Sequence, residues 1–118
     1  MENKIKITSF DEGIVIKISG DLDSSKTFLY KEKIHEHMRQ NGPRYIIWDF
    51  KDLTFLDSAG IGLILGRYNE VERVNGMMGL IGLNTYSRKV IAISGLLSLM
   101  KEYASLKAFI KEEKIEQW

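Results

Sequence analysis

Residues 44–50 (RYIIWDF) are the stretch that most constrains the fold. Their apolar side chains run almost without interruption instead of alternating with polar ones, which is typical of a strand covered on both faces. Such strands occur in α/β proteins, where helices connect neighbouring parallel strands. The segment is therefore predicted to be a central strand, with Trp48 in the core.

The remaining elements can be placed around this strand. Further strands are predicted at residues 4–10, 14–19, 77–83 and 100–103. Apolar residues at helical spacing, with capping residues at the ends, predict helices over residues 24–40, 58–75, 85–93 and 105–114. This order predicts an α/β fold: a mixed sheet of about five strands, with about four helices packed mainly on one face.

The composition of the chain excludes several classes of function. The chain has 118 residues, 17 Lys and Arg against 16 Asp and Glu, and no cysteine. It lacks the basic excess expected of a nucleic-acid binder, and it cannot form a disulfide or a thiolate metal site. No apolar run approaches the ~20 residues of a membrane span. We expect a single cytoplasmic domain over residues 1–118, without a cofactor or metal.

His35 and His37, two residues apart on a helix, point in different directions and are expected to be solvated.

Residues 53–68 (LTFLDSAGIGLILGRY) carry the most information about function. Three glycines fall near or inside the predicted helix, where each costs ~1 kcal/mol relative to alanine. The buried stripe is expected to consist of Ile61, Ile64, Leu65, Tyr68 and Val71. The solvent side would then consist of Ala59, Gly62, Gly66, Asn69 and Arg73. This smooth outward face suits close approach by another protein, and Ser58 lies at its edge.

Simpler interpretations remain open for this segment. The first is that Ser58, which follows Asp57 at a helix start, is a helix cap with no further role. The second is that the glycines accommodate another helix of the same domain. A nucleotide-binding loop is a poor match, because Gly66 comes one residue too late after Gly60 and Gly62 for the G-x-G-x-x-G pattern. No G-x-x-x-x-G-K-[ST] sequence is present either, which disfavours a nucleotide-using enzyme.

Several segments together resemble one family. DSAGIG at residues 57–62 resembles the D-S-[ST]-G-[LIV]-G signature of the anti-sigma factor antagonists, whose fold is the STAS domain. GDLD at residues 20–23 is similar to the family's G-E-L-D, and residues 94–96 match its SGL element. LGRY at residues 65–68 is most similar to the sporulation antagonists of anti-sigma F. The resemblance extends over residues 4–115.

The resemblance implies a regulator rather than an enzyme. Unphosphorylated members bind an anti-sigma factor that is also a serine kinase, and so release a sigma factor. The kinase phosphorylates the serine that maps to Ser58, and a PP2C-type phosphatase reverses the reaction. The residues expected to contact the partner are Asp23, Asp57, Ser58, Ala59, Gly60, Gly62, Leu63 and Gly66. We expect a monomer when the protein is free.

Two positions depart from the family pattern, and several further residues are of interest. Ala59 replaces the usual Ser or Thr after the acceptor, which leaves Ser58 as the only candidate in the motif, and Asp21 replaces Glu. Asp23 is interpreted as a helix cap, a partner contact, or both, and Asp57 is interpreted as a helix cap. Phe28 and Leu29 fall off the core stripe of the first helix, which makes them further candidates for partner contact.

Two alternatives share the fold. One is a general-stress antagonist or stressosome component. The other is a non-switching STAS subunit of a lipid-transport complex, which would not need an acceptor serine at position 58.

Overall fold

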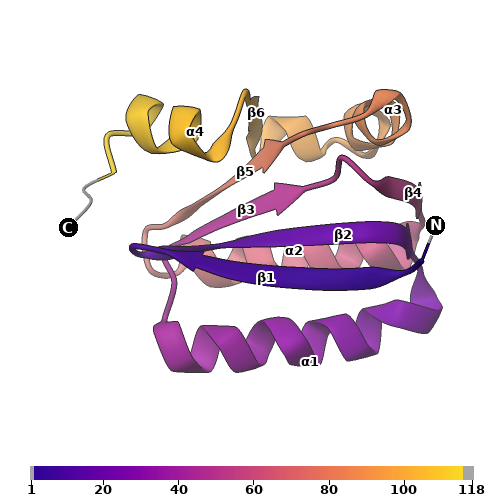
Figure 1. Ribbon diagram of the computed structural model, residues 1–118, viewed down its shortest axis with the longest axis horizontal. Coiled ribbons are helices and arrows are strands. Elements are labelled where there is room, and N and C mark those ends of the chain that lie inside the picture. The colour runs from indigo at the N-terminus through magenta and orange to yellow at the C-terminus, as the bar shows by residue number, and fades with distance from the viewer. Residues whose placement is uncertain (1, 116–118) are drawn as a thin grey trace.

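A mixed sheet of six strands forms the centre of the computed structural model, which describes residues 2–115 and only the backbone of Asn41. The strands are β1 (Lys4–Phe10), β2 (Gly13–Leu22), β3 (Tyr45–Asp49), β4 (Leu53–Leu56), β5 (Met77–Ile81) and β6 (Lys101–Tyr103). Their order is β1-β2-β3-β5-β6, and β4 pairs with the end of β2 (Figure 1). Among the strands of the described residues, only β1 and β2 pair antiparallel. The predicted mixed sheet with β3 at its centre is confirmed.

The helices cover the two faces of the sheet unequally. They are α1 (Ser24–Asn41), α2 (Ser58–Glu72), α3 (Thr85–Ser94), the 3-10 helix η1 (Leu96–Ser98) and α4 (Leu106–Glu112). The first three pack with one face of the sheet in the main core, whereas Phe109 of α4 packs with Ile47 and Tyr103 on the other. The prediction of helices mainly on one face is confirmed, with α4 as the exception.

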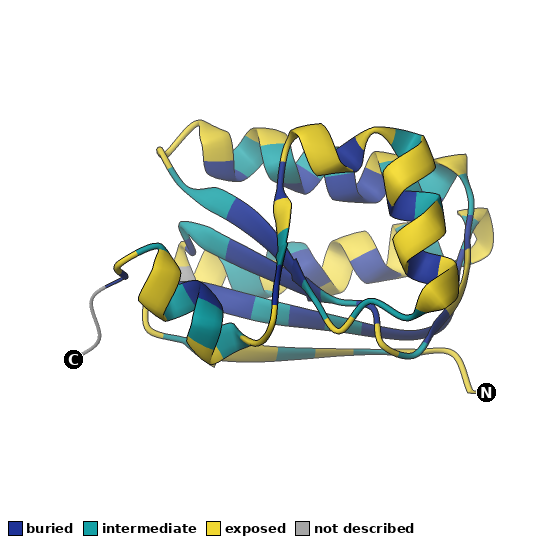
Figure 2. Cartoon of the chain, turned by 90° about the horizontal axis from the view of Figure 1, so that it is seen from above, coloured by how far each residue is buried: buried dark blue, intermediate teal, exposed yellow. Residues whose placement is uncertain are grey.

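This arrangement explains the unbroken apolar character of β3. Successive side chains of a strand point to opposite faces. Ile46 and Trp48 join the core beneath α1, α2 and α3, while Ile47 joins the cluster beneath α4. All three are fully buried. The edge strand β1 instead alternates exposed and half-buried residues and runs along the exposed margin of the sheet, next to the N-terminus in Figure 2.

The structure differs from the sequence prediction at some element boundaries. Strand β4 was not predicted, because Thr54 and Phe55 at its centre are exposed and give no apolar alternation. Its backbone pairs in parallel with β2, and this pairing makes the segment a strand. Helix α2 ends at Glu72 instead of residue 75, and Asn75 turns the chain in the left-handed region with φ 57°. Strand β5 likewise ends at Ile81, because the next residue, a glycine, has φ 67°.

Candidate functional site

Ser58 is the first residue of α2, and its side chain is exposed. Asp57 precedes it as the helix N-cap, with extended backbone and a side-chain Oδ1 that accepts a hydrogen bond from the Gly60 amide at 3.0 Å. The other carboxylate oxygen, Oδ2, accepts from the Ser24 amide at 3.2 Å. Capping by Asp57 was predicted. The structure adds that one carboxylate caps α1 and α2 together, which fixes Ser58 beside the start of α1.

Asp23 caps α1 in its own right, as predicted. Its Oδ1 accepts from the Ser25 amide at 3.0 Å and from the Ser25 hydroxyl at 2.6 Å, and Lys26 Nζ lies 3.6 Å away. The hydroxyl bond has the largest effect on the pKa of Asp23 and lowers it below its ordinary value. Desolvation has the second largest effect and raises this pKa, while the Ser25 amide and Lys26 lower it further. Ser58 therefore lies among the carboxylates of two helix starts.

The glycines of α2 have two different roles. A Cβ atom added to Gly62 or Gly66 would meet nothing within 4 Å, so these positions leave the helix backbone open. At Gly60 an added Cβ would lie 2.6 Å from the backbone oxygen of Leu22 and 2.5 Å from a side-chain carbon of Leu56. Gly60 is buried, so it allows close packing inside the protein and presents no surface to a partner.

The buried stripe of α2 is rotated relative to the predicted one. The buried residues of the helix are Gly60, Leu63, Ile64, Arg67 and Val71. The predicted core residues Ile61, Leu65 and Tyr68 are only half-buried at its margin. Helix α2 packs against α1 as well as against the sheet, and Leu63 and Arg67 lie between the two helices. Leu63, expected to contact a partner, is only 5% exposed.

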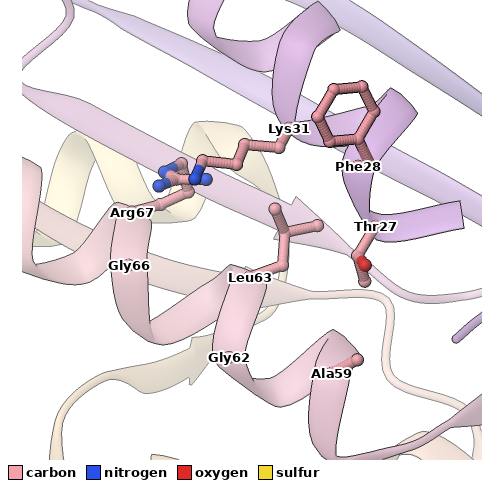
Figure 3. A pocket seen from close by; sticks show the side chains of 8 residues that line it. All are labelled: Thr27, Phe28, Lys31, Ala59, Gly62, Leu63, Gly66 and Arg67. Carbon is pink, nitrogen blue, oxygen red and sulfur yellow. The ribbon is translucent and has the colours of Figure 1, made fainter. Parts of the chain in front are cut away.

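A groove of about 370 Å³ runs between α1 and α2, and we call it the α1–α2 groove. It is lined by Thr27, Phe28, Lys31, Ala59, Gly62, Leu63, Gly66 and Arg67 (Figure 3). The glycines and Ala59 form its α2 side, and Leu63 lies at its floor. Phe28 is 77% exposed and Leu29 is 54% exposed, so both lie off the core as predicted. A contact of either with a partner stays a prediction.

At the Arg67 end of the groove, a polar network joins the two helices, and the sequence prediction missed it. His35 Nε2 lies 3.1 Å from Glu70 Oε2, and Glu70 also pairs with Arg67 Nε. The expectation that His35 is solvated is wrong, because its ring is held against α2. A signal was available: Arg67 lies four residues after Leu63 and three after Ile64, which places it on the buried face, and Glu70 is three residues further on.

Neither a metal site nor a membrane-spanning helix is found among residues 2–115. No group of three His, Cys, Asp or Glu side chains in this part of the chain could hold a metal ion. No helix within it has the length and apolar character needed to cross a membrane.

Comparison with known proteins places the chain in a family. The STAS domain model matches residues 4–109. The anti-sigma F factor antagonist of Lysinibacillus sphaericus is 39% identical over 85 residues, which are 72% of this chain and 73% of the relative. The corresponding antagonist of Paenibacillus polymyxa is 29% identical over 90 residues, 76% of this chain and 77% of the relative.

Solved structures agree with this assignment. The anti-sigma factor antagonist SpoIIAA in its unphosphorylated form is 31% identical and superimposes with a TM-score of 0.80, covering 97% of this chain and all of SpoIIAA. The phosphorylated form of the Bacillus protein is 33% identical with a TM-score of 0.72, covering 93% and 99%. The shared fold, the family match and the sequence identity lead to one conclusion: the chain belongs to the STAS domain family, among the relatives of the anti-sigma factor antagonists.

Proposed function

We propose that this protein is an anti-sigma factor antagonist, a single cytoplasmic STAS domain that is switched by phosphorylation of Ser58. In its unphosphorylated form it binds an anti-sigma factor with serine kinase activity and releases a sigma factor. A PP2C-type phosphatase restores this form. The observation that carries the proposal is the exposed Ser58 at the start of α2, beside a helix face kept open by Gly62 and Gly66.

The proposed contact surface follows from the positions of these residues. It comprises Asp23, Asp57, Ser58, Ala59, Gly62 and Gly66, with Leu63 beneath them. Gly60 is left out because it is buried. The surface needs no catalytic group of its own, since the kinase and the phosphatase supply the chemistry, and the protein acts as a regulator and not as an enzyme.

The switch acts on the interface and not on the fold. A phosphate adds about 1.5 to 2 negative charges and three acceptor oxygens. At the start of α2 the helix dipole favours that charge, and amides of the first turn can donate to it. The domain therefore stays folded. Against a bound partner, the same charge must be taken out of water beside the carboxylate of Asp57, which is costly.

The test uses the purified anti-sigma F factor of Lysinibacillus sphaericus. With magnesium and ATP it should add one phosphate, which mass spectrometry should locate on Ser58. A phosphate on Ser24, Ser25 or Ser94 would contradict the assignment. In calorimetry, Ser58→Ala should bind within a few-fold of wild type, and Ser58→Asp at least ~10-fold more weakly, or ~1.4 kcal/mol. Equal binding by Ser58→Asp and wild type would show that charge is not the switch.

A second candidate places the same switch in a general-stress pathway. It is favoured by 28% identity over 100 residues to the anti-sigma-B factor antagonist of Staphylococcus aureus. Calorimetry with the anti-sigma B factor of that organism decides between the two pathways, because the tighter complex identifies the related partner. A non-switching subunit of a lipid-transport complex is disfavoured, since it would have no use for an exposed acceptor at position 58.

A further inference from the structure

The α1–α2 groove is unusual in its charge. Its lining contains two cationic side chains, Lys31 and Arg67, and no acidic one. Glu70 pairs with Arg67 from outside the lining, so the charge left uncompensated at the groove is that of Lys31. Figure 3 shows Lys31 pointing from α1 toward the end of the groove where Arg67 lies. One end of the groove is therefore basic, whereas the Ser58 end has the carboxylates of Asp23 and Asp57 close by.

Arg67 has an unused hydrogen-bond donor at this end of the groove. The residue is only 6% exposed, and its Nη1 atom is buried without a hydrogen-bond partner among the described residues. Its Nε is bonded to Glu70, but both carboxylate oxygens of Glu70 also face His35 Nε2, at 3.1 and 3.3 Å. A buried guanidinium donor without an acceptor is costly to keep. An acceptor brought into the groove by another molecule would offset that cost once the guanidinium turns to expose Nη1.

Lys31 supplies the second cation. It is exposed, and no ion pair engages it within residues 2–115. Its flexible stem lets the ammonium group approach or leave the groove. Lys31 and Arg67 together present donors from two sides, and a carboxylate, with two acceptor oxygens, can accept from both.

We propose that the basic end of the α1–α2 groove binds an aspartate or glutamate side chain of the anti-sigma factor. This inference rests on the proposed function and adds the chemistry of a second contact. At a rise of 1.5 Å per residue, Arg67 lies about 14 Å along α2 from Ser58. The partner therefore places its acidic side chain about 14 Å from the part that covers Ser58. The exposed ring of Phe28 provides an apolar contact between the two points.

Two measurements test the proposal with the anti-sigma F factor of Lysinibacillus sphaericus and the anti-sigma B factor of Staphylococcus aureus as probes. The first is calorimetry on Lys31→Glu. Its matched control is Lys33→Glu, which makes the same change of charge on the same helix, at a side chain that lies with Ile5 and Ile7 of β1 and away from the groove. We expect Lys31→Glu to bind at least ~10-fold more weakly and Lys33→Glu to stay within ~2-fold of wild type.

The second measurement is zero-length cross-linking of the complex with a carbodiimide. This reagent activates a carboxylate, and the Lys31 amine then attacks it to form an amide, while the carbodiimide takes up the water as a urea. Mass spectrometry should find Lys31 joined to an aspartate or glutamate of the partner, and Lys33 not joined.

The outcomes distinguish a failure of the groove inference from a failure of the proposed function. If wild type binds one of the probes but Lys31 forms no cross-link to it, or Lys31→Glu binds as tightly as Lys33→Glu, the groove inference is wrong and the proposed function stands. If wild type binds neither probe, the proposed function itself fails.

Discussion

The shared cap at Asp57 predicts a graded loss of stability. A cap substitution by alanine costs about 1 kcal/mol for one helix. Asp57 accepts from the amides of Gly60 and Ser24, which belong to two helices. Its charge near two helix starts adds a few tenths of a kcal/mol. Asp57→Ala should therefore cost about 2 kcal/mol. Asp57→Asn should cost about half as much, because its Oδ1 can still accept from Gly60 but its amide nitrogen cannot accept from Ser24.

Urea unfolding followed by far-ultraviolet circular dichroism measures these differences, provided that the denaturant slope is the same in all variants. Asp52→Asn is the control, because within residues 2–115 the side chain of Asp52 forms only a surface pair with Lys17 at 3.2 Å. Its loss should cost less than about 0.5 kcal/mol. Equal losses for Asp57→Asn and Asp57→Ala would refute the two-helix cap. So would a loss for Asp57→Ala no larger than that of the control.

Three further predictions concern packing and titration. Gly62→Ala should raise the free energy of unfolding by about 0.5–1 kcal/mol, because a Cβ there meets open space. Gly60→Ala should lower the free energy of unfolding, because its Cβ would lie 2.6 Å from a backbone oxygen. Urea unfolding of the two variants measures both changes. Burial, followed by the 2.5 Å hydrogen bond to Glu113, raises the pKa of Tyr103 well above 10. The folded state thus keeps a proton that the unfolded chain loses above pH 10, so wild-type stability should fall more steeply than that of Tyr103→Phe between pH 10 and 12, as measured by unfolding at each pH. The pKa of Asp23 should lie below 3.8 when its carboxylate carbon is titrated by NMR.

The sequence predicts the layers of this fold well because local patterns determine them. The unbroken apolar run of β3 reflects burial on both faces, and the capping residues Asp23 and Asp57 begin the helices as predicted. Strand β4 could not be predicted from a local pattern, because two of its four residues are exposed and its pairing with β2 stabilises it.

At the site, the single-element features could be predicted and the features shared between helices could not. The exposure of Ser58 and the openness of Gly62 follow from the pattern of α2 alone. The burial of Arg67 and the second hydrogen bond of Asp57 depend on where α1 lies. A helical wheel contains no information about a neighbouring helix, so the predicted stripe was rotated away from Leu63.

The double cap at Asp57 also determines how an enzyme can reach the neighbouring serine. Drawing Ser58 out as an extended peptide would break the hydrogen bonds that Asp57 accepts from the Gly60 and Ser24 amides, and would begin to unwind α2. A kinase that modifies Ser58 in the native protein must therefore recognise a folded surface and not a linear sequence motif. A synthetic peptide of residues 53–63 contains the acceptor but not α1, and so it should be a poor substrate even for a kinase that modifies the intact domain rapidly.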